Sequence, residues 1–254
     1  MNVISITGAS GGAGATMLAA HLAVSIGQQG HRTLAFDFSP FNTLRLHFGM
    51  DWNVTDGLAP QLLAGKPWNE AAWRSPDGID FMPYGTLEHD SARQQFDALF
   101  NPPRAARWFS DCLATLDIPD DAWIINDVPF PFTPLRAQIV AASTIRVAVL
   151  APDAMSSSNA GRIADSLRPD TNASLRFVLN GYDASRDLDH DVRYLLRAQL
   201  GNALAPVVVH RDESLREALA SKQTVFDYAP SSQAASDLTR LAFWLTAAPQ
   251  SATA

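Results

Sequence analysis

Short apolar runs alternate with longer segments of helical periodicity along the whole chain. Seven runs have the length and the Val, Ile, Leu, Phe and Trp content of buried strands, namely residues 3–7, 33–36, 79–84, 123–126, 146–150, 175–179 and 207–209. Apolar residues at helical spacing fill the segments between them, at residues 18–30, 59–63, 104–116, 160–167, 191–200, 214–221 and 233–247. Strands that alternate with helices are typical of a parallel sheet covered on both faces. The pattern therefore predicts a doubly wound α/β fold with a mostly parallel sheet.

No internal repeat and no linker rich in Pro, Gly or Ser divides this pattern. The chain has 254 residues, 47% of them hydrophobic. A chain of this length can bury roughly 70–75% of the surface that it exposes when unfolded. We expect a single domain over residues 1–248 and a flexible tail over residues 249–254. No apolar run reaches the roughly 18 residues that span a bilayer, so we expect no direct insertion into a membrane.

The charge balance is acidic, with 19 basic and 26 acidic side chains and a net charge of −7. This balance argues against broad, non-specific binding of nucleic acid. The single cysteine, Cys112, excludes an internal disulfide framework and fits a reducing compartment. We therefore expect a cytoplasmic protein that binds no nucleic acid.

A glycine-rich segment, GASGGAGAT, joins the first predicted strand to the first predicted helix at residues 8–16. Main-chain N–H groups in such a turn converge on an anion at the positive end of the helix dipole, so the segment predicts a phosphate site. A P-loop carries Lys before its final hydroxyl residue. Here Ala15 takes the place of that Lys, and Thr16 keeps the hydroxyl. A tight turn that only lets the helix and the strand pack closely stays an alternative.

The same segment also has the TGxxxGxG spacing of short-chain dehydrogenases, and Asp37 at the end of the next strand could hold a ribose. Those enzymes need a Tyr followed four residues later by a Lys. The residues four positions beyond the four tyrosines are Glu88, Arg186, Ala198 and Ser232. The absence of a Tyr–Lys pair disfavours an oxidoreductase.

Three segments together resemble the ParA/MinD branch of P-loop ATPases. SGGAGAT at residues 10–16 aligns without a gap with the deviant Walker A loop of that branch, KGGxGKT[ST]. TLAFD ends at Asp37, which matches the catalytic aspartate of the branch, whereas the second aspartate often found two residues later is Ser39 here. WIINDVP resembles a Walker B strand, with Asp127 placed to hold the water shell of Mg²⁺ and Pro129 at the switch proline. Taken alone, Asp127 is also compatible with a solvated carboxylate at a strand end.

Two later segments extend the resemblance to the base of the nucleotide. FVLN resembles the strand that ends in the adenine-reading Asn, and VVVHRDE resembles the segment whose main chain closes over the base, although an exposed loop would look the same. The resemblance implies that ATP (or ADP) binds together with Mg²⁺. It implies nucleotide contacts from Gly11, Gly12, Ala13, Gly14, Ala15, Thr16, Met17, Asn180, His210, Arg211 and Asp212. It implies that Mg²⁺ is held by Thr16, Asp37 and Asp127, the two carboxylates acting through water.

A closer resemblance covers residues 3–245. SGGAGAT, DFSPFNTLRLHF, GLAPQLLAGKPW and HRDESLREALASKQTVFDY are similar to the BcsQ (YhjQ) family of bacterial cellulose synthase operons, whose members commonly lack the P-loop lysines. The resemblance implies a MinD-like regulator or assembly factor of the cellulose synthase (secretion) complex that forms a homodimer through its nucleotide face. It also implies a small operon-encoded (BcsR-like) partner, contacts with components of the cellulose synthase complex, and recruitment to the inner membrane by these partners.

The missing lysines decide how much activity we expect. Ser10 and Ala15 stand where the ParA/MinD branch has lysines. Loss of one charge-assisted hydrogen bond weakens nucleotide binding by roughly 10- to 150-fold but leaves the main-chain donors in place. Hydrolysis loses more, because phosphoryl transfer needs cations where the transition-state charge spreads. We expect slow or absent hydrolysis. An active cytosolic ParA/MinD-type ATPase for positioning or partition and a pseudo-ATPase scaffold that binds no nucleotide are the alternatives.

Overall fold

One eight-stranded sheet organises the computed structural model, which describes residues 1–101, 105–168 and 173–247. Its strand order is β3-β4-β2-β5-β1-β6-β7-β8. Every neighbouring pair is parallel except β3 and β4. The strands are β1 (Asn2–Gly8), β2 (Thr33–Asp37), β3 (Trp73–Arg74), β4 (Asp80–Met82), β5 (Trp123–Asp127), β6 (Ile145–Leu150), β7 (Ser174–Tyr182) and β8 (Val209–His210). The predicted mostly parallel α/β fold is confirmed.

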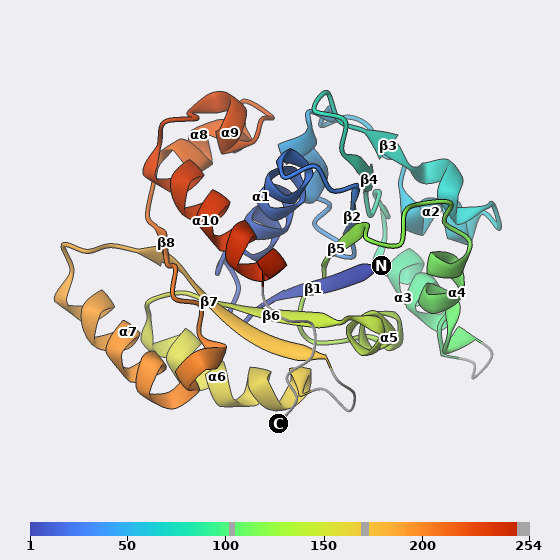
Figure 1. Ribbon diagram of the computed structural model, residues 1–254. Helices are drawn as coiled ribbons and strands as arrows, with labels where there is room; N and C mark the ends of the chain where they lie inside the picture. The colour runs from blue at the N-terminus through green and yellow to red at the C-terminus, as the bar shows by residue number, and fades with distance from the viewer. Residues whose placement is uncertain (102–104, 169–172, 248–254) are drawn as a thin grey trace.

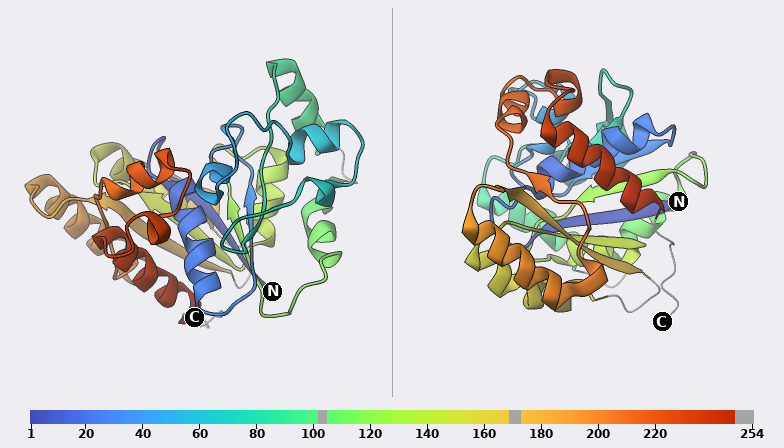
Figure 2. Two further views of the ribbon diagram at one scale, coloured as in Figure 1. Left: turned by 90° about the horizontal axis from the view of Figure 1, so that it is seen from above. Right: turned by 60° about the vertical axis from the view of Figure 1, so that its left-hand side comes forward.

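Helices cover both faces of this sheet (Figures 1 and 2). One face carries α1 (Ala15–Gln28), α9 (Val225–Tyr228) and α10 (Gln233–Ala247), with α8 (Ser214–Ala220) leading into them. The other face carries α2 (Leu58–Leu63), α3 (Asp90–Ala98), α4 (Trp108–Ala114), α5 (Pro134–Ala142), α6 (Ala154–Leu167) and α7 (Asp187–Leu200). Short 3₁₀ turns occur at η1 (Leu44–Phe48), η2 (Trp68–Ala71) and η4 (Gly201–Ala203). Within the described ranges, no helix has both the length and the apolar character to cross a membrane.

Side chains of single strands alternate between two apolar cores, one on each face of the sheet. Val3 of β1 packs into the core beneath α5 and α6, whereas Ile4 and Ile6 pack into the core beneath α1 and α10. Ile124 and Ile125 of β5 divide in the same way. This division follows from the two-residue period of a strand. Both faces of the central strands are therefore apolar, which explains their continuous hydrophobic runs.

Some elements differ from the prediction in extent. Helix α6 begins at Ala154 rather than at residue 160, because Asp153 caps it by accepting a 2.6 Å hydrogen bond from the N–H of Ser156. The serines of its first turns concealed this start from a search for apolar periodicity. Helices α3, α5 and α9 and the short edge strand β3 were not predicted, and the last strand lies at Val209–His210 rather than at 207–209. The predicted tail, 249–254, and the first residue of the predicted helix 104–116 lie outside the described residues.

Candidate nucleotide-binding site

The glycine-rich loop lies between the carboxyl end of β1 and the start of α1, as predicted. Gly12 and Gly14 have φ angles of +79° and +93°, a region that side chains other than glycine rarely adopt. Gly14 is the N-terminal flanking residue of α1, and no side chain caps the helix there. The main-chain N–H groups of the first turn are consequently available to an anion.

A pocket of about 540 Å³ opens over this loop. Its lining consists of residues 8–16 together with Ser39, Phe41, Asp127, Pro129, Phe130, Met155, Asn159 and Arg162. Gly11, Gly12, Ala13, Gly14, Ala15, Thr16 and Asp127, all predicted from the sequence, are thus brought together. The other predicted residues, Met17, Asp37, Asn180, His210, Arg211 and Asp212, do not line this pocket. Its size suits a small molecule such as a nucleotide.

Thr16 and Asp127 form the polar floor of the pocket. The hydroxyl Oγ1 of Thr16 donates a 2.6 Å hydrogen bond to Oδ2 of Asp127. Asp127 ends β5, and its register partner on β2 is Asp37. Burial raises the pKa of Asp127 above its usual range. Burial, together with the charge of Asp127, also raises the pKa of Asp37 well above its usual range. The ends of β2 and β5 therefore hold two neighbouring buried carboxyl groups. Their raised pKa values disfavour ionisation of both groups at once.

Asp37 uses both of its oxygens within the loop that follows β2. Oδ1 accepts a 2.8 Å hydrogen bond from the N–H of Ser39, and Oδ2 accepts one of 3.1 Å from the N–H of Leu44. The carboxyl group is fully buried and lies behind the lining of the pocket. Ser39, two residues further on, is the residue of this segment that lines the pocket wall with Phe41. Ser39, and not a second carboxylate, thus borders the pocket two residues after Asp37.

Asn180, near the carboxyl end of β7, contacts the glycine loop. Its Nδ2 donates a 2.8 Å hydrogen bond to the main-chain oxygen of Ala13. A Cβ atom built on Gly14 would collide with the same amide group, so only glycine fits there. Met17 is the third residue of α1, and its main-chain oxygen lies 2.7 Å from Nδ1 of His21. Asn180 therefore supports the loop from outside the pocket.

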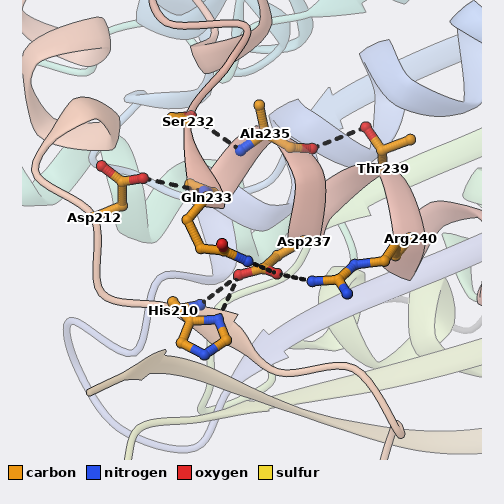
Figure 3. A network of polar contacts seen from close by, with 9 residues as sticks. His210, Asp212, Ser232, Gln233, Ala235, Asp237, Thr239 and Arg240 are labelled. Carbon is orange, nitrogen blue, oxygen red and sulfur yellow. Dashed lines mark hydrogen bonds and ion pairs between the residues drawn. The ribbon is translucent and has the colours of Figure 1, made fainter. Parts of the chain in front are cut away.

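The predicted base-side segment, VVVHRDE at residues 207–213, contains β8. Asn180 is the register partner of Val209, which places this segment next to the loop-supporting amide. Figure 3 shows His210 beneath Asp237, whose Oδ2 lies 2.7 Å from His210 Nδ1 and accepts a 3.0 Å hydrogen bond from the N–H of His210. Gln233 and Arg240 donate to the other oxygen of Asp237. His210 is thus held in one orientation by a buried carboxylate.

Arg211 and Asp212 have different surroundings. The N–H of Arg211 donates a 2.9 Å hydrogen bond to the main-chain oxygen of Tyr182, and its side chain is exposed. Asp212 accepts hydrogen bonds from the N–H groups of Ser214 at 3.0 Å and Ala234 at 3.1 Å. Asp212 therefore joins the starts of α8 and α10, and this structural role accounts for both of its oxygens.

The family model described as Cellulose biosynthesis protein BcsQ matches residues 1–246. The chain belongs to the BcsQ family. The BcsQ of Salmonella typhimurium is 30% identical over 247 residues, which cover 96% of this chain and 94% of the relative. The predicted family membership is confirmed.

Solved structures place this BcsQ-family chain among MinD-like folds. The Mg-ADP complex of MinD from Pyrococcus horikoshii has a TM-score of 0.75 at 21% identity and covers 96% of this chain and 95% of that one. Cobyrinic acid a,c-diamide synthase from Mycobacterium smegmatis, with a bound ATP analog and magnesium, has a TM-score of 0.75 at 18% identity, with 96% and 94% covered. At these identities the likeness shows the fold, and the predicted P-loop type of fold is confirmed.

In this BcsQ-family chain the two lysine positions of the loop are filled by small residues. The hydroxyl groups of Ser10 and Ser156 lie 3.1 Å apart, so Ser10 points toward the start of α6. Of the chain's two lysines, Lys222 pairs with Asp51 and Lys66 is exposed, and neither lines the pocket. The loop itself consequently offers main-chain donors and the hydroxyls of Ser10 and Thr16, without a cation.

The sequence did not single out Phe41, Phe130, Met155, Asn159 or Arg162 for the site. These residues come from the segments after β2 and β5 and from α6. The parallel pairing of β1 with β5 and β6 brings these segments to the same edge of the sheet. Carboxyl ends of parallel strands are the usual place for ligands in such folds. The position of these segments directly after strands was therefore the signal by which the sequence could have indicated them.

Proposed function

We propose that this protein binds Mg·ATP (or Mg·ADP) in the pocket over residues 8–16 and acts as a nucleotide-dependent assembly factor or regulator in cellulose biosynthesis. The observation that carries this proposal is the 2.6 Å hydrogen bond between Thr16 and Asp127, set within a loop of exposed glycines. The hydroxyl of a P-loop and the carboxylate of a Walker B strand meet in this way where they share a magnesium ion.

The residues present fit a magnesium ion. Thr16 offers a hydroxyl oxygen, and Asp127 with Asp37 offers buried carboxyl groups whose pKa values are raised. Hard oxygen ligands of this kind suit Mg²⁺, which keeps several of its own waters. When bound, Mg²⁺ would neutralise charge on the phosphates and on the two carboxylates. Asp37 lies behind the pocket lining, so it would act through water.

Slow or absent hydrolysis is part of the proposal. Ser10 and Ala15 supply no cation to the phosphates, and Ser39 supplies no second carboxylate to order an attacking water. Main-chain donors support binding of the ground state, whereas turnover depends on groups placed at the transition-state charge. The presence and identity of the bound nucleotide, rather than the rate of its hydrolysis, would then control assembly.

Association through the nucleotide face is supported by two exposed apolar side chains. Phe41 is 86% exposed and Met155 is 64% exposed, and both line the pocket. Large apolar side chains gathered at one opening are typical of an interaction surface. A two-fold homodimer would bury the same face of both subunits.

The family's name supports the choice of partners. Relatives are described as cellulose biosynthesis proteins, so components of the cellulose synthase complex and a small operon-encoded (BcsR-like) protein are the partners we propose. These contacts would bring a cytoplasmic protein to the inner membrane without insertion of its own. The net charge of −7 gives no support to binding of nucleic acid.

Purified protein tests the proposal in two measurements. Denaturation followed by chromatography of the released small molecules should yield ATP or ADP, and light scattering with saturating Mg·ATP should give a dimer. If denaturation releases no nucleotide and calorimetry gives no heat with millimolar Mg·ATP, the protein is a scaffold that binds no nucleotide. Phosphate release at the rate of lysine-bearing relatives would favour an active ATPase.

A further inference from the structure

Helix α6 contributes Met155, Asn159 and Arg162 to the lining of the pocket. The first turns of α6 lie against the glycine loop. The hydroxyl oxygens of Ser156 and Ser10 are 3.1 Å apart, and Nδ2 of Asn159 donates a 3.4 Å hydrogen bond to the main-chain oxygen of Ala9. Arg162 follows Asn159 by three residues and lies on the same side of the helix. Both side chains line the pocket.

Aromatic contact positions the guanidinium group of Arg162. Its Cζ atom lies 5.4 Å from the ring centroid of Phe130, which also lines the pocket. A cation over an aromatic face is attracted by the electron density of the ring and keeps its N–H donors free at its edges. Among the described residues, no carboxylate lies within ion-pair distance of Arg162. Its positive charge is therefore available to a ligand.

The pocket lining contains one cation and one carboxyl group, Arg162 and Asp127. A bound polyphosphate needs positive charge beyond that of a single Mg²⁺, and the loop supplies none at Ser10 and Ala15. Arginine binds phosphate with two parallel N–H donors, which lysine cannot do. The charge that the loop lacks is thus offered by helix α6.

The geometry points to Arg162 as the phosphate-binding cation of this site, which contacts the outermost phosphate of ATP in place of the missing P-loop lysines. This assignment rests on the proposed nucleotide site. It makes the pocket selective for a triphosphate over a diphosphate, because the outermost phosphate is the group that Arg162 would contact.

Calorimetric titration with Mg·ATP, Mg·ADP and AMP tests the assignment on the full chain. Arg162→Ala should weaken ATP binding by about 10- to 150-fold, ADP binding less, and AMP binding not at all. Arg162→Lys should restore part of the affinity, since it keeps the charge and loses the paired donors. Arg168→Ala is the matched control, because Arg168 lies on the exposed end of the same region and pairs with Asp165. It should bind all three nucleotides like the unmodified protein.

Different results separate this inference from the proposed function. If the unmodified protein binds ATP and Arg162→Ala binds it within twofold, the assignment of Arg162 is wrong while the nucleotide site stands. An equal loss for ATP and ADP would overturn the contact with the outermost phosphate. If the unmodified protein binds no nucleotide at all, both proposals fail. Thermal unfolding without nucleotide should be the same for Arg162→Ala and the unmodified protein, because Arg162 is exposed.

Discussion

The side-chain amide of Asn180 donates a 2.8 Å hydrogen bond to the main-chain oxygen of Ala13, from the end of β7 to the glycine loop. The same amide fills the space that a side chain at Gly14 would need. The loop therefore keeps its open shape through a contact with a strand far along the chain. In a protein without P-loop lysines, this shape is what remains to bind phosphate.

Gly14→Ala should distort the loop. The new methyl group would collide with Asn180, and the residue would be held at φ +93°, where alanine is strained. We expect the free energy of unfolding to fall by about 1–3 kcal/mol and nucleotide affinity to fall with it. Gly11→Ala is the control, since a Cβ there meets nothing within 4 Å. Urea unfolding and calorimetry measure both effects, and equal behaviour of the two variants would contradict the prediction.

Thr16→Ala removes the hydroxyl that joins the loop to Asp127. We expect Mg·ATP affinity to fall by about 10-fold or more, because a hydrogen bond to a charged group and a magnesium ligand are lost together. Thr16→Ser keeps the hydroxyl and should bind normally. Titrations with EDTA in place of Mg²⁺ should show no difference between the variants. A loss of the same size without Mg²⁺ would mean that the hydroxyl contacts the nucleotide rather than the metal.

Asp127→Asn should stabilise the protein without Mg²⁺ at neutral pH. The pKa of Asp127 is raised by burial, so the folded state binds a proton more tightly than the unfolded state. Stability from this group is thus present at low pH and falls as pH rises through the folded pKa. The uncharged amide avoids this loss and should add about 1–3 kcal/mol at pH 7, with little gain below pH 4. Asp37→Asn should not stabilise equally, because both oxygens of Asp37 accept N–H groups.

The histidines His21 and His47 should produce the opposite dependence on pH. Burial lowers the pKa of His21 to about 4 and that of His47 to about 3, and their rings lie 5.2 Å apart. The unfolded state therefore takes up protons first as pH falls below 6.5, and stability is lost from there down to the folded pKa. Between pH 7.5 and pH 5, each histidine should cost about 2 kcal/mol. His47→Phe should reduce this loss in thermal unfolding at the two pH values, and an unchanged loss would exclude His47 as a cause.

Phe41→Ser should weaken the proposed dimer. An apolar ring that is 86% exposed in one subunit would be buried twice in a two-fold interface. We expect the dissociation constant with Mg·ATP to rise by about 10-fold or more, as followed by light scattering over a range of protein concentrations. Phe243→Ser is the control, since Phe243 is 55% exposed on α10 and does not line the pocket. Equal effects of the two variants would remove the nucleotide face as the interface.

Local signals made the glycine loop and the strand end at Asp127 predictable. The strand, the glycines and Thr16 are contiguous in sequence, so their sequence pattern alone predicts a strand, a turn and a helix start in this order. Asp127 ends the run WIIND, which begins with three large apolar residues, and was assigned to a strand end for the same reason. These residues line the pocket together.

Other parts of the site depend on which strands become neighbours. Arg162 and Asn159 reach the loop only because β6 pairs with β1, a relationship that no local pattern encodes. Asp37 was placed at the right strand end, but the hydrogen bonds from Ser39 and Leu44 turn its carboxyl group away from the pocket. Sequence periodicity reports the face of an element, whereas the direction of a side chain at its end is set by the loop that follows.

Because the sheet separates the two apolar cores, each core can accept substitutions without a change in the packing of the other. Val3 and Ile4 are adjacent in β1, yet a change at one alters the packing beneath α5 and α6 and a change at the other alters the packing beneath α1 and α10. Substitutions without shared partners have nearly additive effects on stability. Helices of the first layer that do not contact the glycine loop, such as α4 and α7, can accordingly change to suit new binding partners while the layer of α1 and α10 keeps its own packing.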